Sequence, residues 1–217
     1  MLEDVSYSLD KGKTWTTVQN QDNEEVVITT PRVESYNNVL WKGNGISTST
    51  ATSSTVVADR PASSAMFSSD GKFNIEGNIM SLLYGSNYQN QTSFENDSTS
   101  NFALLFYSYN TETKANIVSI ENLVMPVLEM KETSYFRMFQ GCSELTKSCK
   151  LPAVTLANRC YMSMFYGCTN LSVAPVLSAT QLAEYCYCGM FNGCTSLTTA
   201  PELPATVLAN SCYQGMF

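Results

Sequence analysis

The eight cysteines are the residues of this chain best suited to chemistry, because thiolates bind zinc, form disulfides and act as nucleophiles. Three of them, Cys160, Cys186 and Cys212, recur every 26 residues in apolar surroundings. We expect them to be buried on successive helices, which pack about 8–10 Å apart. A disulfide needs Cα atoms closer than about 7 Å, so these thiols are predicted to be unpaired. The chain has no histidine, and Cys186 and Cys188 would point to opposite sides of a helix, so we expect no metal site.

Acid–base chemistry has few candidates in this chain. Histidine is the commonest general base and the usual partner of a nucleophilic Ser or Cys, so its absence removes most hydrolytic mechanisms. The nearest carboxylate pairs, Glu24 with Glu25 and Glu129 with Glu132, lie in polar segments, where we expect them to be solvated. We therefore predict no catalytic residue, no cofactor and no enzymatic activity.

The charge and polarity of the chain exclude further classes of protein. A net charge of −7 and an isoelectric point near 4.6 argue against nucleic-acid binding, which needs clustered Lys and Arg. Only 14% of the residues are charged, and a surface rich in Ser, Thr, Asn and Gln suits an extracellular or virion protein. No apolar stretch is long enough to span a membrane, and the N-terminus lacks the pattern of a signal peptide.

Five short segments within residues 1–95 alternate apolar and polar side chains, which predicts a small antiparallel β-sandwich domain, interrupted by a linker rich in Ser, Thr and Ala at residues 47–64. Within it, the sequence SLDKGKTW at residues 8–15 resembles the Asp-box of sialidases and other β-proteins, with Asp10 and Gly12 forming a hairpin turn. A propeller enzyme would need several copies, and we find one copy with a partial echo at residues 69–73. The strands are expected at residues 5–9, 14–18, 25–30, 38–42 and 72–76.

Aromatic residues are concentrated where this domain meets the remainder of the chain. Aromatic rings can stack on sugars, but at a domain junction we expect them to form core. These residues are Tyr84, Tyr88, Phe94, Phe102, Phe106, Tyr107 and Tyr109.

The C-terminal part repeats with a period of 26 residues. The pair Met-Phe recurs at positions 138, 164, 190 and 216, and columns of Tyr, Leu and Gly-Cys keep the same spacing. A period in this range is typical of a solenoid, in which each unit buries its apolar side against the next unit.

Each repeat unit is predicted to contain one helix and one short strand. Apolar residues at 156, 157, 160, 161, 164 and 165 predict an amphipathic helix of about three turns, and Gly167 follows at its end. The run 171–177 predicts a brief strand that ends at Pro175. The expected fold is thus an α/β repeat solenoid with short parallel strands and helices, covering residues 96–217.

The start of this solenoid is predicted from an eroded repeat. Phe102, Leu105 and Phe106 match an earlier copy that carries a seven-residue insertion. We therefore expect a capping unit at about residues 96–122, followed by repeats over 123–217.

The repeat resembles the BspA-type leucine-rich repeats of bacterial surface proteins, particularly those of gut Bacteroidales. The string CYCGMFNGCTSLTTAPELPATVLA at residues 186–209 carries this resemblance, which extends over about residues 100–217. Cys149 and Ser178 depart from the pattern, since other units have proline there. The resemblance implies a right-handed solenoid with a parallel sheet on one side, and a role in adhesion or protein binding.

The candidate binding residues lie on the sheet side, where solenoids usually bind. One column holds a cation, an apolar residue and an anion in successive units, and only an exposed position tolerates such variety. This column is Lys150, Val176 and Glu202, and a second, hydroxyl-bearing column is Thr146, Ser172 and Thr198.

We therefore predict a non-enzymatic protein-binding or adhesion protein on a bacterial cell surface or secreted, with a protein or glycan ligand. The alternative is a structural or receptor-binding fibre or decoration protein of a bacteriophage that infects gut bacteria, which would explain the missing signal peptide and the reduced thiols. Because Phe217 falls inside a predicted helix, we expect the repeats to continue beyond it, or the open end to be covered by another copy or chain.

Overall fold

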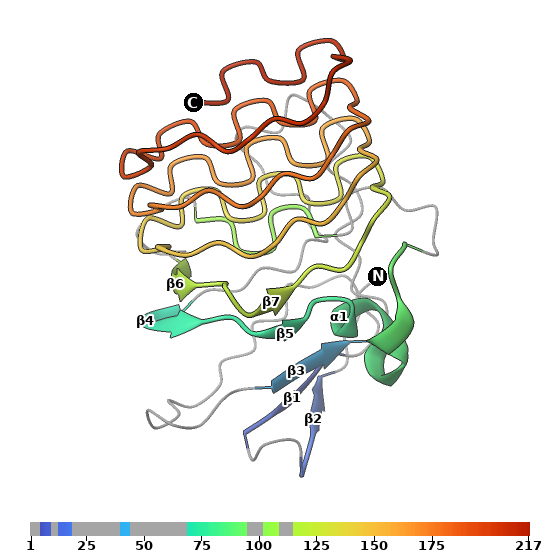
Figure 1. The fold of residues 1–217 in the computed structure, drawn as a ribbon. Helices are drawn as coiled ribbons and strands as arrows, with labels where there is room; N and C mark the ends of the chain where they lie inside the picture. The colour runs from blue at the N-terminus through green and yellow to red at the C-terminus, as the bar shows by residue number, and fades with distance from the viewer. Residues whose placement is uncertain (1–4, 10–12, 19–39, 44–68, 95–101, 109–114) are drawn as a thin grey trace.

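The computed structural model describes residues 5–9, 13–18, 40–43, 69–94, 102–108 and 115–217 (Figure 1). In the N-terminal part, β1 (Val5–Ser8) lies between β2 (Thr16–Val18) and β3 (Leu40–Gly43) in an antiparallel sheet. The predicted strands at 5–9, 14–18 and 38–42 are thereby confirmed. The predicted strand at 25–30 and the turn residues Asp10 and Gly12 lie outside the described residues.

The fifth predicted strand belongs to a different sheet. It corresponds to β4 (Ser69–Asn74), which pairs in parallel with β6 (Ala115–Ser119), and β5 (Gly77–Asn78) pairs in parallel with β7 (Leu123–Val124). The prediction that residues 72–76 join the antiparallel domain is therefore wrong. Together with β5, this strand instead adds the first parallel layer to the repeats, with β4 next to β6 and β5 next to β7 (Figure 1).

One hydrophobic core continues across the predicted domain boundary at residue 95. The helix α1 (Ser81–Tyr84) and the 3₁₀ helix η1 (Gly85–Asn90) follow β5. Side chains before the boundary, such as Met80 and Phe94, are buried in the same cluster as those of the last repeat, such as Met216. The segment 69–94 therefore packs as part of the repeat structure.

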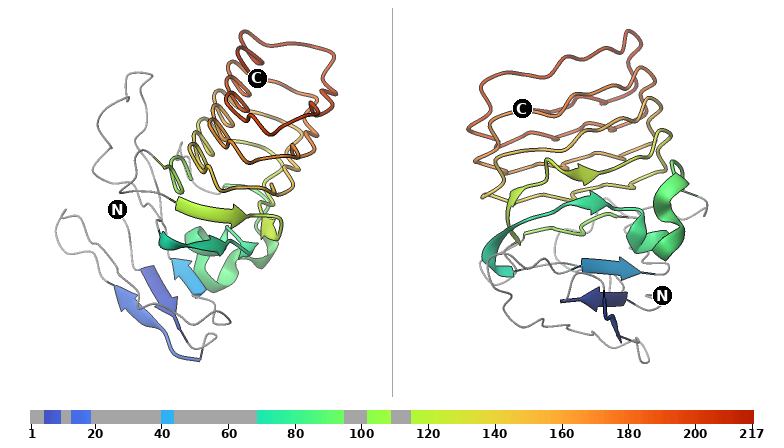
Figure 2. Two further views of the ribbon diagram at one scale, coloured as in Figure 1. Left: turned by 90° about the vertical axis from the view of Figure 1, so that its left-hand side faces the viewer. Right: turned by 60° about the horizontal axis from the view of Figure 1, so that its bottom comes forward.

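Residues 115–217 form a stack of coils, each lying in register on the one before it (Figures 1 and 2). Single parallel bridges join equivalent positions of neighbouring coils, at Lys147 with Val173 and Leu151 with Leu177. The 26-residue period of the sequence is therefore the period of the stack. The expected strand at 171–177 is reduced to two such bridges, because Pro175 between them has no amide hydrogen to donate.

A run of consecutive β-turns takes the place of the predicted helix. Between residues 157 and 168, alternate amides donate to the carbonyl three residues earlier, as Met164 does to Tyr161 (3.2 Å). The amides between them donate to the next coil, as Tyr161 does to Cys186 (3.0 Å). No helix occurs in residues 115–217, all of which the structure describes, so the prediction of a helix at 156–165 is wrong.

The difference arises from a repeat of four residues that imitates helical periodicity. At about 100° per residue, an α-helix drifts by about 40° every four residues. Here every fourth residue has a left-handed backbone, at Arg159 (φ 56°), Ser163 (φ 55°) and Gly167 (φ 72°), so side chains four apart point the same way without drift. A left-handed residue cannot continue an α-helix. Half of the amides that a helix would pair internally are paired within the turns, and the alternate ones are paired with the neighbouring coil, which satisfies them in the core.

Glycine is required at the third left-handed position of the first full coil. Gly141 has φ 78°, and a Cβ atom placed on it would collide with the backbone carbonyl of Ser108. The coils can approach each other this closely only because this position has no side chain.

Two ladders of stacked aromatic rings run along the interior of the stack. Ring centroids are 5.7 Å apart for Tyr161 and Tyr187 and 5.9 Å apart for Phe165 and Phe191, with nearly parallel planes. The predicted burial of the Met-Phe pairs at 164–165 and 190–191 is confirmed, although turns surround them instead of helices. One ladder is Phe102, Tyr135, Tyr161, Tyr187 and Tyr213, and the other is Phe106, Phe139, Phe165, Phe191 and Phe217.

The ladders confirm that residues near 102 form an earlier copy of the repeat. Phe102 stacks on Tyr135 and Phe106 stacks on Phe139, and each partner lies 33 positions later, one 26-residue period plus the predicted seven-residue insertion. The amide of Phe102 also donates to the carbonyl of Ser134, as in the later coils (2.8 Å).

Direct hydrogen bonding between coils changes the expected geometry of the cysteine columns. Backbones bonded in this way lie about 4.8 Å apart, which is within the Cα range of a disulfide. The helix spacing that we used to separate Cys160, Cys186 and Cys212 is therefore wrong. The structure nevertheless holds all eight cysteines as free thiols, and these three are buried as predicted.

Candidate binding face

The bridge face is the side of the stack formed by residues 119–129, 145–155, 171–181 and 197–207, which carries the parallel bridges between the first three of these segments. Extended segments point successive side chains to opposite sides. At the Leu151–Leu177 bridge, both leucine side chains are buried, and the residues just before them, Lys150 and Val176, are exposed. The coil stack thus displays outward columns only at the positions of the repeat whose side chains point away from the core, such as that of Lys150 and Val176.

The structure brings the first predicted column together on this face. Lys150, Val176 and Glu202 follow one another at intervals of 26 residues and are all exposed, Val176 to 74%. The inference that only an exposed position tolerates a cation, an apolar residue and an anion agrees with this placement. Their role in binding stays a prediction.

In the second predicted column, two residues are exposed and one is held in a hydrogen bond within the fold. Ser172 and Thr198 are exposed. Thr146 is half-buried, and its hydroxyl donates to the carbonyl of Val118 in the preceding coil (2.9 Å). Thr146 therefore has a structural hydrogen bond, and only the two later members remain available for a partner.

Exposed aliphatic side chains are the feature of this face that sequence reasoning missed. Val173 is 68% exposed, and Val124, Leu128 and Val154 are each between two-fifths and half exposed. Val124 precedes Lys150 by one 26-residue period, so extending the repeat one unit toward the N-terminus would have placed it in the first column. Such a concentration of exposed apolar side chains is typical of a protein-binding surface.

Ionic charge contributes little to the bridge face. The ammonium group of Lys147 lies 2.8 Å from a carboxylate oxygen of Glu121 one coil away, and both side chains are more than half exposed. Exposed pairs of this kind stabilise a fold only slightly, by about 0–1 kcal/mol. The main effect of the Lys147–Glu121 pair is that its two charges neutralise each other beside Val173, which leaves the centre of the face nearly neutral.

The buried thiols are held away from reaction. Those of Cys142, Cys168 and Cys194 donate to carbonyl oxygens of the preceding coil at 3.2, 3.1 and 3.1 Å. Burial raises the pKa of Cys142 to about 12 and that of Cys194 to about 11. Because the thiolate is the nucleophile, such groups are unreactive near neutral pH. Among the described residues, no three His, Cys, Asp or Glu side chains are placed to hold a metal ion.

Aromatic rings near the predicted domain junction form core. Phe94, Phe102 and Phe106 are buried, and Phe94 packs at a tilt against Phe102 and Tyr135 with centroids 6.1 Å apart. The predicted core role is confirmed for these three. Tyr84 and Tyr88 are partly buried against the same core, whereas Tyr109 lies outside the described residues.

In the described part of the chain, no helix has the length and apolarity needed to cross a membrane. We compared the sequence and structure with known protein families, curated proteins and solved structures, and none of them matches this chain.

Proposed function

We propose that this chain is a non-enzymatic protein-binding or adhesion protein, built on a BspA-like leucine-rich repeat solenoid and displayed on a bacterial surface. The observation that carries the proposal is the bridge face, where Val173 and Val176 are each about 70% exposed in a nearly neutral surface above a buried hydrophobic core. Repeat proteins commonly bind through such extended faces.

A protein partner fits this face better than a glycan. Its exposed apolar side chains are Val and Leu, whereas sugars are commonly held by stacking on aromatic rings. Tyr166 is the one tyrosine among the described residues with a large exposed fraction, 43%, and it belongs to the turns on another side of the stack. The ligand class supported is thus a protein surface with a complementary apolar patch and little net charge.

A phage fibre or decoration protein is the second candidate function. Seven of the eight thiols are buried, and all eight are free, which agrees with folding in a reducing cytoplasm before assembly into a virion. Secreted proteins more often have their cysteines paired.

Binding of the chain to an array of bacterial and host proteins and glycans tests the main proposal. We expect the chain to bind at least one protein on the array, and we expect the double variant Val173→Asp, Val176→Asp to lose this binding. Because both side chains are exposed, these changes leave the core intact, which circular dichroism checks. A matched control, Thr195→Asp, alters an exposed residue outside the bridge face instead. Equal binding by both variants, or binding to glycans alone, would contradict the proposal.

A further inference from the structure

One column of the bridge face alternates apolar and charged side chains along the stack. Its members stand one repeat period apart in successive coils, and all of them are exposed. Parallel bridges join the first three of these coils at this face, so their backbones lie about 4.8 Å apart, the spacing of paired strands. In order along the stack, the members of this central column are Val124, Lys150, Val176 and Glu202.

Lys150 carries an uncompensated charge in the middle of this column. The other lysine of the bridge face, Lys147, is paired with Glu121 at 2.8 Å. Among the described residues, no carboxylate lies within ion-pair distance of Lys150. Its neighbours in the column are the apolar side chains of Val124 and Val176. A complementary surface therefore brings a carboxylate to Lys150 and an apolar side chain to either side of it.

An α-helix that lies along the stack places its side chains at the spacing of these coils. A helix rises about 1.5 Å per residue, so its residues i, i+3 and i+7 stand at about 0, 4.5 and 10.5 Å and share one stripe of its surface. The three bridged coils stand at about 0, 4.8 and 9.6 Å. An extended strand in the same direction spaces the residues on one side about 6.6–6.8 Å apart, which does not match the coils.

We propose that the bridge face binds an amphipathic α-helix of another protein, laid along the stack with an acidic residue on Lys150. The inference rests on the proposed protein-binding function and names the partner. The helix carries an apolar residue at i, Asp or Glu at i+3, an apolar residue at i+7, and Lys or Arg at i+10 opposite Glu202. The described residues of this chain contain no α-helix longer than the four-residue α1, so we assign the helix to a different protein.

The exposed valines on either side of the central column become the flanks of this contact. Val173 precedes Val176 by three residues, and Val154 follows Lys150 by four. A helix with its side chains is about 10–12 Å wide, so it covers more than one column and brings apolar side chains over both flanks. Contact with these valines supplies the apolar part of binding, as when a helix docks in a groove. Lys150 then fixes the position of the helix along the stack.

A yeast-displayed library of helical peptides, randomised along one face, tests this inference on the full chain. Peptides of about 24 residues are long enough to span the column. Sorting selects for binding to the chain and against binding to the Val173→Asp, Val176→Asp variant, so the peptides retained contact the bridge face. We expect them to carry apolar, acidic, apolar and basic residues at i, i+3, i+7 and i+10, or in reverse order for the opposite helix direction.

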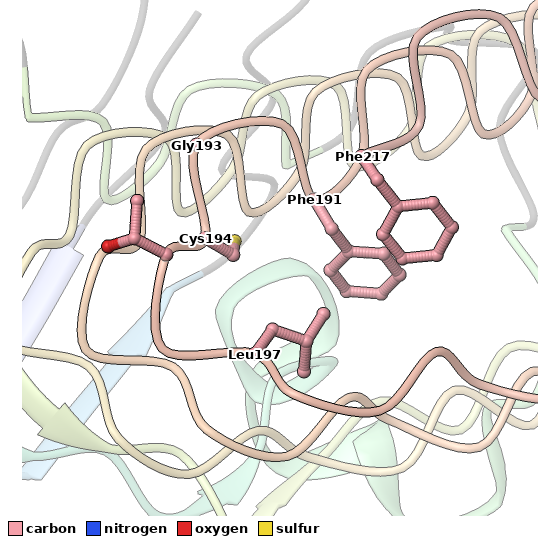
Figure 3. A pocket seen from close by; sticks show the side chains of 6 residues that line it. Phe191, Gly193, Cys194, Leu197 and Phe217 are labelled. Atoms are coloured by element: carbon pink, nitrogen blue, oxygen red, sulfur yellow. The ribbon is translucent and has the colours of Figure 1, made fainter.

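Reversal of the charge at Lys150 tests the position of the helix. Lys150 is exposed, so Lys150→Glu leaves the core intact, and it should weaken binding of the selected peptides about tenfold or more. A lysine in place of the acidic residue of the peptide should restore binding. Lys13→Glu, the same change at an exposed site of the N-terminal part, should have no effect. Thr195→Asp, in the pocket of about 160 Å³ beside Phe217 (Figure 3), should also have none.

Retained peptides that lack this spacing, or that bind Lys150→Glu as tightly as the parent chain, overturn the inference. A library that yields no peptide bound at the bridge face overturns it as well. The proposed function fails separately, if proteins on the array still bind the Val173→Asp, Val176→Asp variant. An array partner that is lost in this variant, together with a library without helical binders, therefore leaves the bridge face as the binding site and removes only the helix.

Discussion

Replacing Phe165 by alanine removes a ring from the middle of a ladder and should destabilise the protein strongly. Phe165 is fully buried, with Phe139 at 5.7 Å on one side and Phe191 at 5.9 Å on the other. Truncation of a buried Phe to Ala costs about 3–5 kcal/mol of stability. Each stacked pair of rings contributes about 0.5–1.5 kcal/mol beyond the burial of its surface. We therefore expect a loss of about 4 kcal/mol in the free energy of unfolding.

Phe217→Ala is the matched control, because it removes the same side chain from an exposed position of the same ladder. Phe217 is 56% exposed and stacks on one ring only, so about 1 kcal/mol is expected. Phe165→Leu keeps most of the buried volume and loses both ring contacts, so its effect should fall between the two. The loss in the free energy of unfolding should therefore be largest for Phe165→Ala, intermediate for Phe165→Leu and smallest for Phe217→Ala.

Urea unfolding followed by near-ultraviolet circular dichroism measures these losses, since stacked rings dominate that signal. With a slope of about 2–3 kcal/mol per molar urea, the Phe165→Ala midpoint should fall by about 1–2 M. Tryptophan fluorescence serves as a second probe, because both tryptophans, Trp15 and Trp41, lie in the N-terminal part. Equal losses for Phe165→Ala and Phe217→Ala, or a loss below about 1 kcal/mol for the former, would refute the ladder.

Three further predictions follow from the turns and the thiols. Gly141→Ala should destabilise the protein by at least about 1–2 kcal/mol in chemical unfolding, because its φ is 78° and its Cβ would meet Ser108, whereas Gly215→Ala, with open space around it, should cost less. The free energy of unfolding should fall as pH rises above about 9, because burial raises the pKa of Cys186 to about 11 and the folded state then holds a proton that the unfolded state releases. Each such thiol lowers the free energy of unfolding by up to about 1.4 kcal/mol per pH unit. A urea midpoint that stays constant between pH 8 and 10 would contradict this. Iodoacetamide at pH 8 should modify Cys188, the half-buried thiol, before the seven buried ones, as followed by intact-protein mass spectrometry. Reaction of all eight thiols at the same rate would contradict this, as would a mass increase on reduction, which would reveal disulfides.

The 26-residue register could be predicted from the sequence because stacking forces equivalent positions to have equivalent surroundings. Met164 and Phe165 are buried for the reason that the repeat suggested, and Phe102 could be assigned to an earlier copy of the repeat despite the seven-residue insertion. The outward position of Lys150, Val176 and Glu202 could be inferred because residues of unlike chemistry share one column.

The conformation of the turn segments was predicted wrongly because a spacing of four residues is close to the helical 3.6. Two signals pointed away from a helix. The inward pairs, such as Leu156 with Ala157 and Cys160 with Tyr161, keep a strict spacing of four without drift, and glycine stands inside the segment at Gly189 and Gly215. Glycine is unfavourable within a helix but suits a left-handed position, which both residues occupy.

The exposed valines of the bridge face were missed for a different reason. Val173 and Val124 are β-branched residues in extended segments, where the usual expectation is burial. Their columns contain Lys147 and Lys150 in other coils, and a column holding a lysine must face solvent. Comparison of each valine with its column, and not with its neighbours along the chain, identifies it as exposed.

The hydrogen bonds between coils are the feature on which the whole account depends, and scalar couplings across hydrogen bonds in NMR detect them directly. The account predicts that amides of alternate turn residues couple to carbonyl carbons 25 positions later, as for Tyr135 to Cys160, Phe139 to Met164 and Phe165 to Met190. Couplings from these amides to carbonyls four positions earlier would instead establish the α-helix and contradict the stack of turns.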